Sequence, residues 1–196
     1  MLNDASTPYS LLATRRSGKP REMIAPGPDD AQLRAILEVA IRTPDHGKLS
    51  PWRFVIVGDD RRDAFARLLT DAYRAEKPAA GRLELEAMEQ FARQAPSLVI
   101  ALHSPANGSH IPQWEQALST GAAVMNLLHG AHAQGFVGGW LTGWPTYNAA
   151  VRAAFGNEHE RIAGFVFLGS PGKEPEERPR PDYDKVVSNW TPPVLG

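Results

Sequence analysis

The sequence predicts an α+β fold, and three observations support that class. Apolar residues recur at helical spacing in several segments, and short runs of β-branched and aromatic residues lie between those segments. The expected order is helix, helix, strand, helix, helix, strand, helix, strand, helix, strand, which lacks the strict alternation of a parallel α/β sheet. The chain has 196 residues, of which 42% are hydrophobic, so it can form one domain with a sizeable core.

The first two helices have recognisable boundaries. Thr7 and Pro8 are a cap residue and a first-turn proline, and the helix is expected to run to the two arginines that follow it. The second helix opens at residue 29 or 30 and has one apolar face. We expect it to end at Thr43, because Pro44 disfavours helical geometry in the residue before it.

Two strands and two helices are expected in the middle of the chain. "WRFVIV" at 52–57 and "SLVIALH" at 97–103 are rich in β-branched and aromatic residues, which predicts strands. The residues between them predict an amphipathic helix over 59–77 and a further helix over 80–93, which stops before Pro96.

A long apolar segment follows. Residues 112–134 are apolar on nearly every face of a helix, which places that helix at the centre of a core or of a subunit interface. "GFVGGWLTG" at 135–143 resembles a strand, and its glycines indicate that backbone closely approaches a neighbour or a ligand. A short helix over 146–155 and the strand "IAGFVFLG" at 162–169 complete the body.

The tail has a different composition. Six of the 26 residues from Pro171 onward are proline, so this segment cannot form a core of its own. It carries the β-prone patch "KVVSNW", which indicates docking on another surface such as a partner subunit; the alternative is an undocked terminus. We assign residues 1–170 to the body and 171–196 to a proline-rich arm of the same domain.

Composition excludes several classes of function. The net charge of −1 provides no global attraction to nucleic acid or to an anionic membrane, so neither is expected as a partner. The absence of cysteine excludes disulfides, thiolate zinc sites and cysteine nucleophiles, and it is compatible with a reducing cytosol. The N-terminus lacks the basic start and apolar core of a signal peptide. We therefore expect a cytoplasmic protein.

Two short motifs combine cations with turns. "RRS" at 15–17 places two guanidinium groups and a hydroxyl at a helix end, a donor set suited to an oxyanion, although arginines there also serve as helix caps. "RTPDHGKLSPWRF" at 42–54 stops a helix abruptly and continues into a strand. Arg42 and His46 can then both point into the space beyond the helix end; a lone histidine is more often structural, so both a structural role and a ligand contact stay open for His46.

Motifs for other chemistry are absent from the sequence. His129 and His132 would share one helix face, but no carboxylate lies near them, so no metal site is expected. There is no P-loop, no dinucleotide-binding G-x-G-x-x-G, no G-x-S-x-G and no evident catalytic carboxylate pair. No catalytic side chain is predicted. Binding through arginine, glycine backbone and aromatic rings fits a phosphorylated aromatic cofactor better.

These motifs together resemble those of the nitroreductase-like flavoproteins, over nearly the whole chain. The pieces that carry the resemblance, in order, are "RRS" at 15–17, "RTPDH" at 42–46, "PWRF" at 51–54, "PQWEQ" at 112–116, "STGAAVM" at 119–125, "AQGF" at 133–136, "GWLTG" at 139–143 and "IAGFVFLGSP" at 162–171. No single piece is specific, but coincidence does not account for so many in family order.

The resemblance implies a fold, a cofactor and a set of contacts. It implies a central, mostly antiparallel sheet flanked by helices, and a homodimer that binds FMN at the subunit interface, with the C-terminal arm embracing the partner. The implied FMN contacts are Arg15, Arg16, Ser17, Arg42, His46, Trp140, Leu141 and Thr142, with His46 reaching the site of the opposite subunit. The implied nicotinamide-nucleotide contacts are Gly130, Ala131, His132, Ala133, Gln134 and Gly135.

The implied activity is an FMN-dependent oxidoreductase reaction. NADPH or NADH would give hydride to flavin N5, and a flat, electron-poor small molecule such as a nitro compound or a quinone would take the electrons. Three alternatives stay open: a flavin-fragmenting or dehalogenating enzyme of the same fold, a flavin-binding protein without turnover, and a structural module whose arginines are solvated caps.

Leu141 departs from the family pattern. Relatives often carry arginine or lysine at this position, next to the flavin ring. A nearby cation stabilises anionic reduced flavin, so leucine is expected to make reduction less favourable unless another cation compensates.

Overall fold

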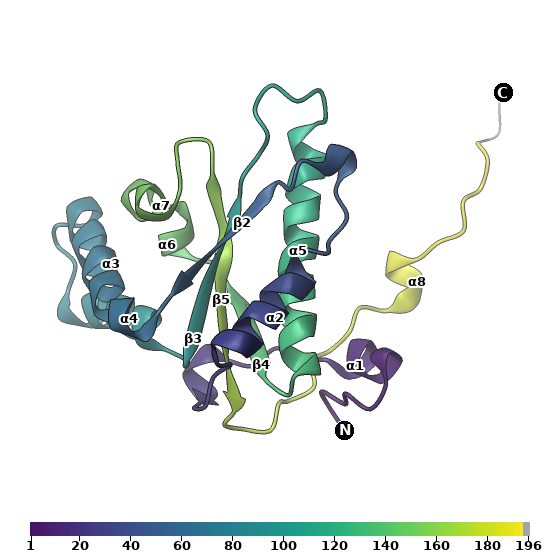
Figure 1. Ribbon diagram of the computed structural model, residues 1–196, viewed down its shortest axis with the longest axis horizontal. Helices are drawn as coiled ribbons and strands as arrows, with labels where there is room; N and C mark the ends of the chain where they lie inside the picture. The colour runs from purple at the N-terminus through teal and green to yellow at the C-terminus, as the bar shows by residue number, and fades with distance from the viewer. Residues whose placement is uncertain (194–196) are drawn as a thin grey trace.

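The computed structural model describes residues 1–193 as a five-stranded antiparallel sheet between two layers of helices (Figure 1). The strand order is β1 (Met23–Ile24), β5 (Arg161–Pro171), β3 (Ser97–His103) and β2 (Trp52–Val57), and β4 (Val137–Leu141) also pairs with β5. The predicted α+β class and the central antiparallel sheet are confirmed.

Both faces of the sheet are buried, and the strand period of two divides the core into halves. Along β3, Leu98 and Ile100 face one half and Val99 the other. The next strand repeats this alternation, with Phe165 and Phe167 on the first face. Burial on both faces explains why the β3 sequence is continuously apolar.

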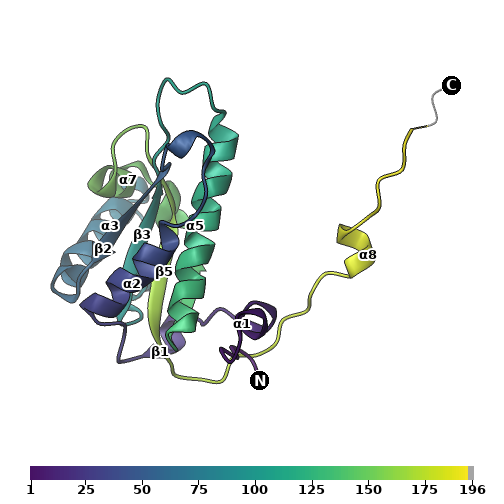
Figure 2. The same ribbon diagram turned by 45° about the vertical axis from the view of Figure 1, so that its right-hand side comes forward.

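Different helices cover the two faces. α3 (Arg62–Glu76), α4 (Arg82–Arg93) and α7 (Ala149–Phe155) pack on the face of Phe165 and Phe167. α2 (Asp30–Ala40) and α5 (Gln113–Ala133) pack on the opposite face. The views in Figures 1 and 2 both show α5 running the length of the sheet beside α2. The predicted central position of the long apolar helix is confirmed.

The helix α2 is shorter than predicted. Its start is as expected: the Asp29 side chain accepts a hydrogen bond from the Gln32 N–H, and the Gln32 side-chain oxygen accepts one from the Asp29 N–H, a reciprocal capping box. Its end at Ala40 precedes the expected Thr43. The Ala40 carbonyl accepts from both the hydroxyl and the backbone N–H of Thr43, at 2.9 and 3.3 Å, so a tight turn replaces the next α-helical turn there.

The first helix is also shorter than predicted, and several short elements were missed. α1 spans Pro8–Thr14, because Arg15 adopts an extended ψ of 128°. The missed elements are β1, α6 (Trp144–Tyr147), α8 (Tyr183–Val186) and three 3₁₀ turns, η1 (Pro20–Glu22), η2 (His46–Lys48) and η3 (Asp59–Arg61). All are too short to show a hydrophobic period, and β1 exists only through its pairing with the end of β5.

The chain leaves the body after β5. In both views the segment passes beside α1 and then extends outward, with α8 away from the sheet (Figures 1 and 2). All described residues from Tyr183 to Trp190 are exposed. The last three residues of the predicted arm 171–196 lie outside the described residues. Among residues 1–193, no helix combines the length and the apolarity needed to cross a membrane.

Candidate functional site

The Arg15–Ser17 segment begins where α1 ends. Thr7 caps the helix by accepting from the Ser10 N–H at 3.0 Å, and the Arg15 N–H closes its last turn on the Leu11 carbonyl. The Arg16 N–H then donates to the Asn3 side chain at 2.6 Å. The two arginines are therefore presented from a backbone that is tied down on both sides.

The next residues lie directly on β4. The Gly18 N–H donates to the Gly138 carbonyl at 3.1 Å. A Cβ on Gly139 would stand only 2.7 Å from the Gly18 oxygen, so only glycine permits this approach. The predicted close approach of backbone at the glycine-rich strand is confirmed, and it aligns the arginine segment with the strand that ends in Trp140 and Leu141.

A cavity of about 480 Å³ adjoins the arginine segment and is rich in charge. Its cations come from two distant parts of the chain: Arg16 and Lys19 from the N-terminal part, Lys173 and Arg178 from the arm. Glu22 lies within 3.6 Å of the Lys19 ammonium and 3.7 Å of the Lys173 ammonium. Ser17 lines the same cavity. Four carboxylates, those of Glu22, Glu174, Glu176 and Glu177, line the cavity beside these four cations. The lysine and arginine groups are donors of the kind that bind phosphate.

Arg16 is enclosed by the arm. Only 12% of its side chain is exposed. Its Nε donates to the Glu176 carbonyl at 3.2 Å and lies 3.4 Å from an Oε1 of Glu177. Arg180 reaches the same oxygen at 3.5 Å. The arm root therefore closes one wall of the cavity.

Arg15 lies on the other side of this cluster. Its Nη1 donates to the Ser17 hydroxyl at 3.2 Å. Burial, and then the charges of Arg16 and Arg180, lower the pKa of Arg15. No carboxylate pairs with Arg15 among the described residues. Arg16 and Arg180 thus meet at the Glu177 carboxylate, and Arg15 lies near enough to both arginines for their charges to act on it.

Two histidines of α5 border Arg15. His132 is 3% exposed, and neither of its ring nitrogens has a partner among the described residues; the same holds for Nδ1 of His129. Burial, followed by the charges of Arg15 and His129, lowers the pKa of His132 to about 4, so the ring is neutral near pH 7. A second cavity, of about 480 Å³, adjoins His132 and Gly135.

The predicted nicotinamide-nucleotide residues do not all face one space. Gly130 and Ala131 are buried, with the Cβ position of Gly130 against Ile36 and Val39 of α2. Ala133, Gln134 and Gly135 are exposed.

The end of β4 holds the residues predicted beside the flavin ring. The Trp140 indole N–H donates to the Ala163 carbonyl at 3.0 Å, and the ring lies beside Gly121 of α5 with 37% of the residue exposed. Leu141 points to the opposite face, where it packs with the core and lines a cavity of about 750 Å³ that Phe91 also borders. Thr142 is exposed.

Arg42 and His46 lie elsewhere. After α2 the chain runs along α5: Asn126 donates to the Thr43 hydroxyl at 2.6 Å, and Ser119 donates to the Pro44 carbonyl at 2.8 Å. It reaches Glu115, whose carboxylate lies 2.8 Å from Nδ1 of His46. Arg42 and His46 are both exposed.

The predicted FMN contacts therefore form two groups within one chain. Glu115 and His129 are about 20 Å apart along α5, given the helical rise per residue. His46 lies at the first position and Arg15 near the second. Arg15, Arg16, Ser17 and the end of β4 come together, whereas His46 lies at the opposite end of the helix. Arg42 lies between them, next to Thr43, which Asn126 contacts about 5 Å along the helix axis from His129.

Large apolar side chains are exposed on α5, at the end of α2 and on α1. Trp114 and Leu118 stand one turn apart on α5, 71% and 54% exposed. Ile41 at the end of α2, and Tyr9 and Leu12 of α1, are also exposed. Exposed apolar residues that cluster in this way mark a surface for another macromolecule.

Sequence reasoning missed the cations contributed by the arm. Lys173, Arg178 and Arg180 come to Arg16 only because β5 continues to Pro171, where it pairs with Met23 of β1. No local motif signals this juxtaposition. Residues 1–193 contain no group of three or more acidic or histidine side chains arranged to hold a metal ion.

Known proteins resemble this chain along most of its length. The sequence model of the Nitroreductase family matches residues 12–170. "Putative NAD(P)H nitroreductase YdjA" of Escherichia coli (strain K12) is 37% identical over 166 residues, covering 82% of this chain and 86% of that protein.

Solved structures share the fold. A nitroreductase-like family protein from Bacillus cereus superposes with a TM-score of 0.77 at 19% identity, over 93% of this chain and 95% of that one. The FMN and NADPH-dependent nitroreductase NfnB of Sphigopyxis sp. strain HMH superposes with a TM-score of 0.70 at 20% identity, over 92% and 96% of the two chains. With the cation cavity beside a glycine-rich strand and the sequence match over 12–170, this chain belongs to the nitroreductase family.

Proposed function

We propose that this protein is an FMN-dependent NAD(P)H oxidoreductase that acts as a homodimer. The observation that carries the proposal is the arginine segment Arg15–Ser17, which lies across β4 so that a cation-rich cavity and the exposed Trp140 end of the strand share one surface. Family membership and the FMN named in the description of the NfnB structure support the same cofactor.

The residues present fit FMN at both ends. Arg15, Arg16 and Ser17 would hold the phosphate through charge-assisted hydrogen bonds, with Lys19 and Lys173 adding positive charge. The segment crosses β4 at Gly138, and Leu141 is about 10 Å further along the strand, a distance that an extended ribityl chain and its phosphate can span. The Gly18–Gly139 contact leaves no side chain in between.

The ring end has fixed and neutral surroundings. The bond from Trp140 to the Ala163 carbonyl holds the indole in one orientation, so it offers a preorganised flat surface. Backbone N–H groups near Thr142 and Gly143 are our candidates for contact with flavin N5. When bound, FMN would accept hydride from NADPH or NADH and pass the electrons to a flat, electron-poor acceptor such as a nitro compound or a quinone. No side chain is assigned a covalent role.

A second copy of the chain would complete each site. His46 lies about 20 Å from Arg15 along α5, too far for one cofactor to meet both within a chain. The exposed Trp114 and Leu118 flank Glu115, the partner of His46, on α5. Pairing of two such surfaces would bury the apolar side chains and carry Arg42 and His46 to the partner's cofactor. The arm 171–196 would then embrace that partner.

We assign the nicotinamide nucleotide to fewer residues of the 130–135 segment than the family resemblance implies. Gly130 and Ala131 are buried against α2, so we propose that nucleotide contacts in the 130–135 segment come from the exposed Gln134 and Gly135 and from His132 at the edge of its cavity.

The visible spectrum of the purified protein tests the proposal. We expect flavin absorbance that bleaches on anaerobic addition of NADPH or NADH and returns when a nitroaromatic compound or a quinone is added. Flavin that no nucleotide bleaches would favour a carrier, and flavin absorbance lost under oxygen would favour the fragmenting alternative. A colourless protein that remains colourless with added FMN would contradict the proposal.

A further inference from the structure

The arm places a carboxylate on the arginines that we assign to the cofactor phosphate. An Oε1 of Glu177 lies 3.4 Å from Nε of Arg16 and 3.5 Å from Nη2 of Arg180, and it accepts the Arg178 N–H at 2.8 Å. Two guanidinium groups and one backbone N–H therefore surround a single carboxylate oxygen. This is the donor pattern by which proteins bind a phosphate oxygen.

The charges of this cluster mean that the Glu177 carboxylate and a bound phosphate would compete for the same arginines. Arg15, Arg16 and Arg180 lie close enough for their charges to act on one another, and Glu177 is the carboxylate that pairs with two of them. A phosphate placed on Arg16 would stand beside the Glu177 carboxylate, and two anions at that distance repel. Either the carboxylate moves away or the phosphate binds less tightly.

We propose that Glu177 competes with the cofactor phosphate for Arg16, so that the arm root acts as a displaceable latch on the cofactor site. This inference rests on the proposed function. The same contact also fastens the arm: Arg16 donates to the Glu176 carbonyl at 3.2 Å, and beyond Arg180 the chain projects from the body (Figure 2). Binding of the phosphate thus releases the segment that leads to α8, which couples cofactor loading to freedom of the arm.

The test compares FMN with riboflavin, which lacks the phosphate. Full-length protein is stripped of flavin, and each affinity is measured by the quenching of flavin fluorescence. We expect Glu177→Gln to tighten FMN binding about two- to five-fold, the size expected for an ion pair whose carboxylate is exposed, and to leave riboflavin binding unchanged.

Glu176→Gln is the matched control. It removes the same charge one residue away, while the backbone carbonyl that contacts Arg16 stays in place. We expect it to leave both affinities within about 1.5-fold, because a more distant exposed charge is screened. In an Arg16→Ala background, Glu177→Gln should no longer tighten FMN binding, since the shared partner is gone.

Three results would overturn the latch. FMN binding that is unchanged or weaker in Glu177→Gln would mean that Glu177 positions Arg16 instead. Equal tightening of FMN and riboflavin would place the effect away from the phosphate, and so would tightening that persists without Arg16. If wild-type protein and both variants bind neither flavin, the proposed function fails instead of the latch.

Discussion

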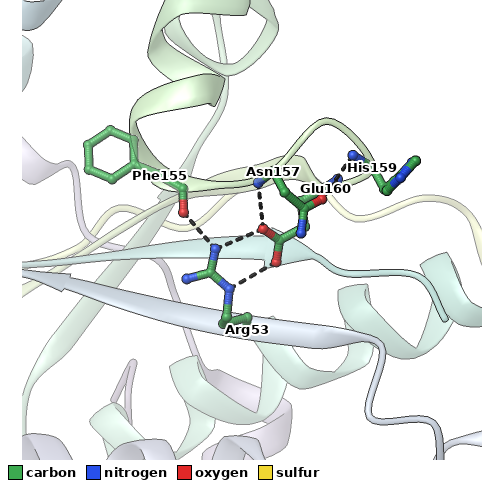
Figure 3. Close-up of polar contacts among 5 residues, drawn as sticks. All are labelled: Arg53, Phe155, Asn157, His159 and Glu160. Carbon is green, nitrogen blue, oxygen red and sulfur yellow. Dashed lines mark hydrogen bonds and ion pairs between the residues drawn. The ribbon is translucent and has the colours of Figure 1, made fainter. Parts of the chain in front are cut away.

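Two charged clusters lie at opposite ends of β5 and differ in how their charges are satisfied. At its start, Glu160 is 3% exposed and accepts from Arg53 through both oxygens, at 2.9 and 2.8 Å (Figure 3). The Asn157 N–H donates to the same carboxylate, and Arg53 also reaches the Phe155 carbonyl at 2.6 Å. At its end, Arg16 and Arg180 share Glu177 with Arg15 nearby, and the buried His132 and half-buried His129 have ring nitrogens without a partner among residues 1–193.

The difference separates structure from binding. In the Arg53–Glu160 cluster one cation meets one anion, and each carboxylate oxygen has a donor, so nothing remains for a ligand. In the arginine cluster, positive charge exceeds negative charge and polar atoms are left over. Such an excess is costly in an isolated fold and is expected where an anion binds. Each prediction below tests one side of this contrast.

The largest expected effect is on stability at the Arg53–Glu160 cluster. Glu160→Gln leaves the Arg53 guanidinium without its anion, and because Arg53 is half exposed we expect a loss of about 2–3 kcal/mol, or about 5–10 °C in Tm. Thermal unfolding measures it. Glu158→Gln, at an exposed position, should change Tm by less than about 2 °C. A strong loss of FMN affinity in Glu160→Gln would contradict the assignment of the Arg53–Glu160 cluster to structure and not to binding.

The second effect is on the cofactor and not on stability. Arg16→Ala should weaken FMN binding by about 10- to 100-fold, as expected for the loss of a charge-assisted hydrogen bond, while riboflavin binding changes little. Flavin titration measures both. Arg34→Ala, which breaks an exposed helical pair with Glu38, is the control and should leave both affinities unchanged. Normal FMN affinity in Arg16→Ala would remove this residue from the site.

The pH dependence of stability should separate the two clusters. Hydrogen bonds from Arg53, more than any other cause, lower the pKa of Glu160 from 4.5 to about 2, so its contribution is lost as pH falls through that window. Burial lowers the pKa of His132 from 6.5 to about 4. As the pH falls from 6.5 to 4, the unfolded chain therefore binds a proton that the folded chain does not, and the free energy of unfolding decreases. Each contribution is at most about 3 kcal/mol.

Single variants assign these windows, in urea unfolding measured from pH 7.5 to pH 2. His132→Leu should flatten the profile above pH 4 and, by removing unpartnered nitrogens, stabilise the protein at pH 7 by about 1 kcal/mol. Glu160→Gln should flatten only the lower window. A destabilised His132→Leu would mean that the histidine nitrogens have partners after all.

The smallest effect on stability is expected at His46. Its pair with Glu115 is exposed on both sides, so His46→Ala should change the unfolding free energy by less than about 0.5 kcal/mol. If His46 serves the partner's cofactor, the same variant should weaken FMN binding. Affinity measured at concentrations above and below dimer dissociation tests this, and a weakening that is independent of the dimer would contradict the two-chain site.

Local sequence signals were sufficient for much of the fold. The capping box at Asp29, the helical period of α2 and the apolar strands β2 and β3 all depend on residues within a few positions of each other. The same is true of "RRS" at 15–17, which the sequence places at a helix end and which the structure finds there. The errors of prediction lie at the ends of helices, where the contacts of a single residue such as Thr43 determine which residue is the last of the helix.

The sequence by itself determined the α+β class, the central helix, the close approach at the glycine-rich strand and the arginine segment. Tertiary structure alone decided that Arg53 meets Glu160 across 107 positions, and that the arm brings Lys173, Glu177 and Arg180 to Arg16. It also separated His46 from Arg15. The physical reason is the sequence distance between the interacting residues. Helix caps and hydrophobic periods depend on residues close together in the chain, whereas these contacts depend on strand register and on where β5 ends.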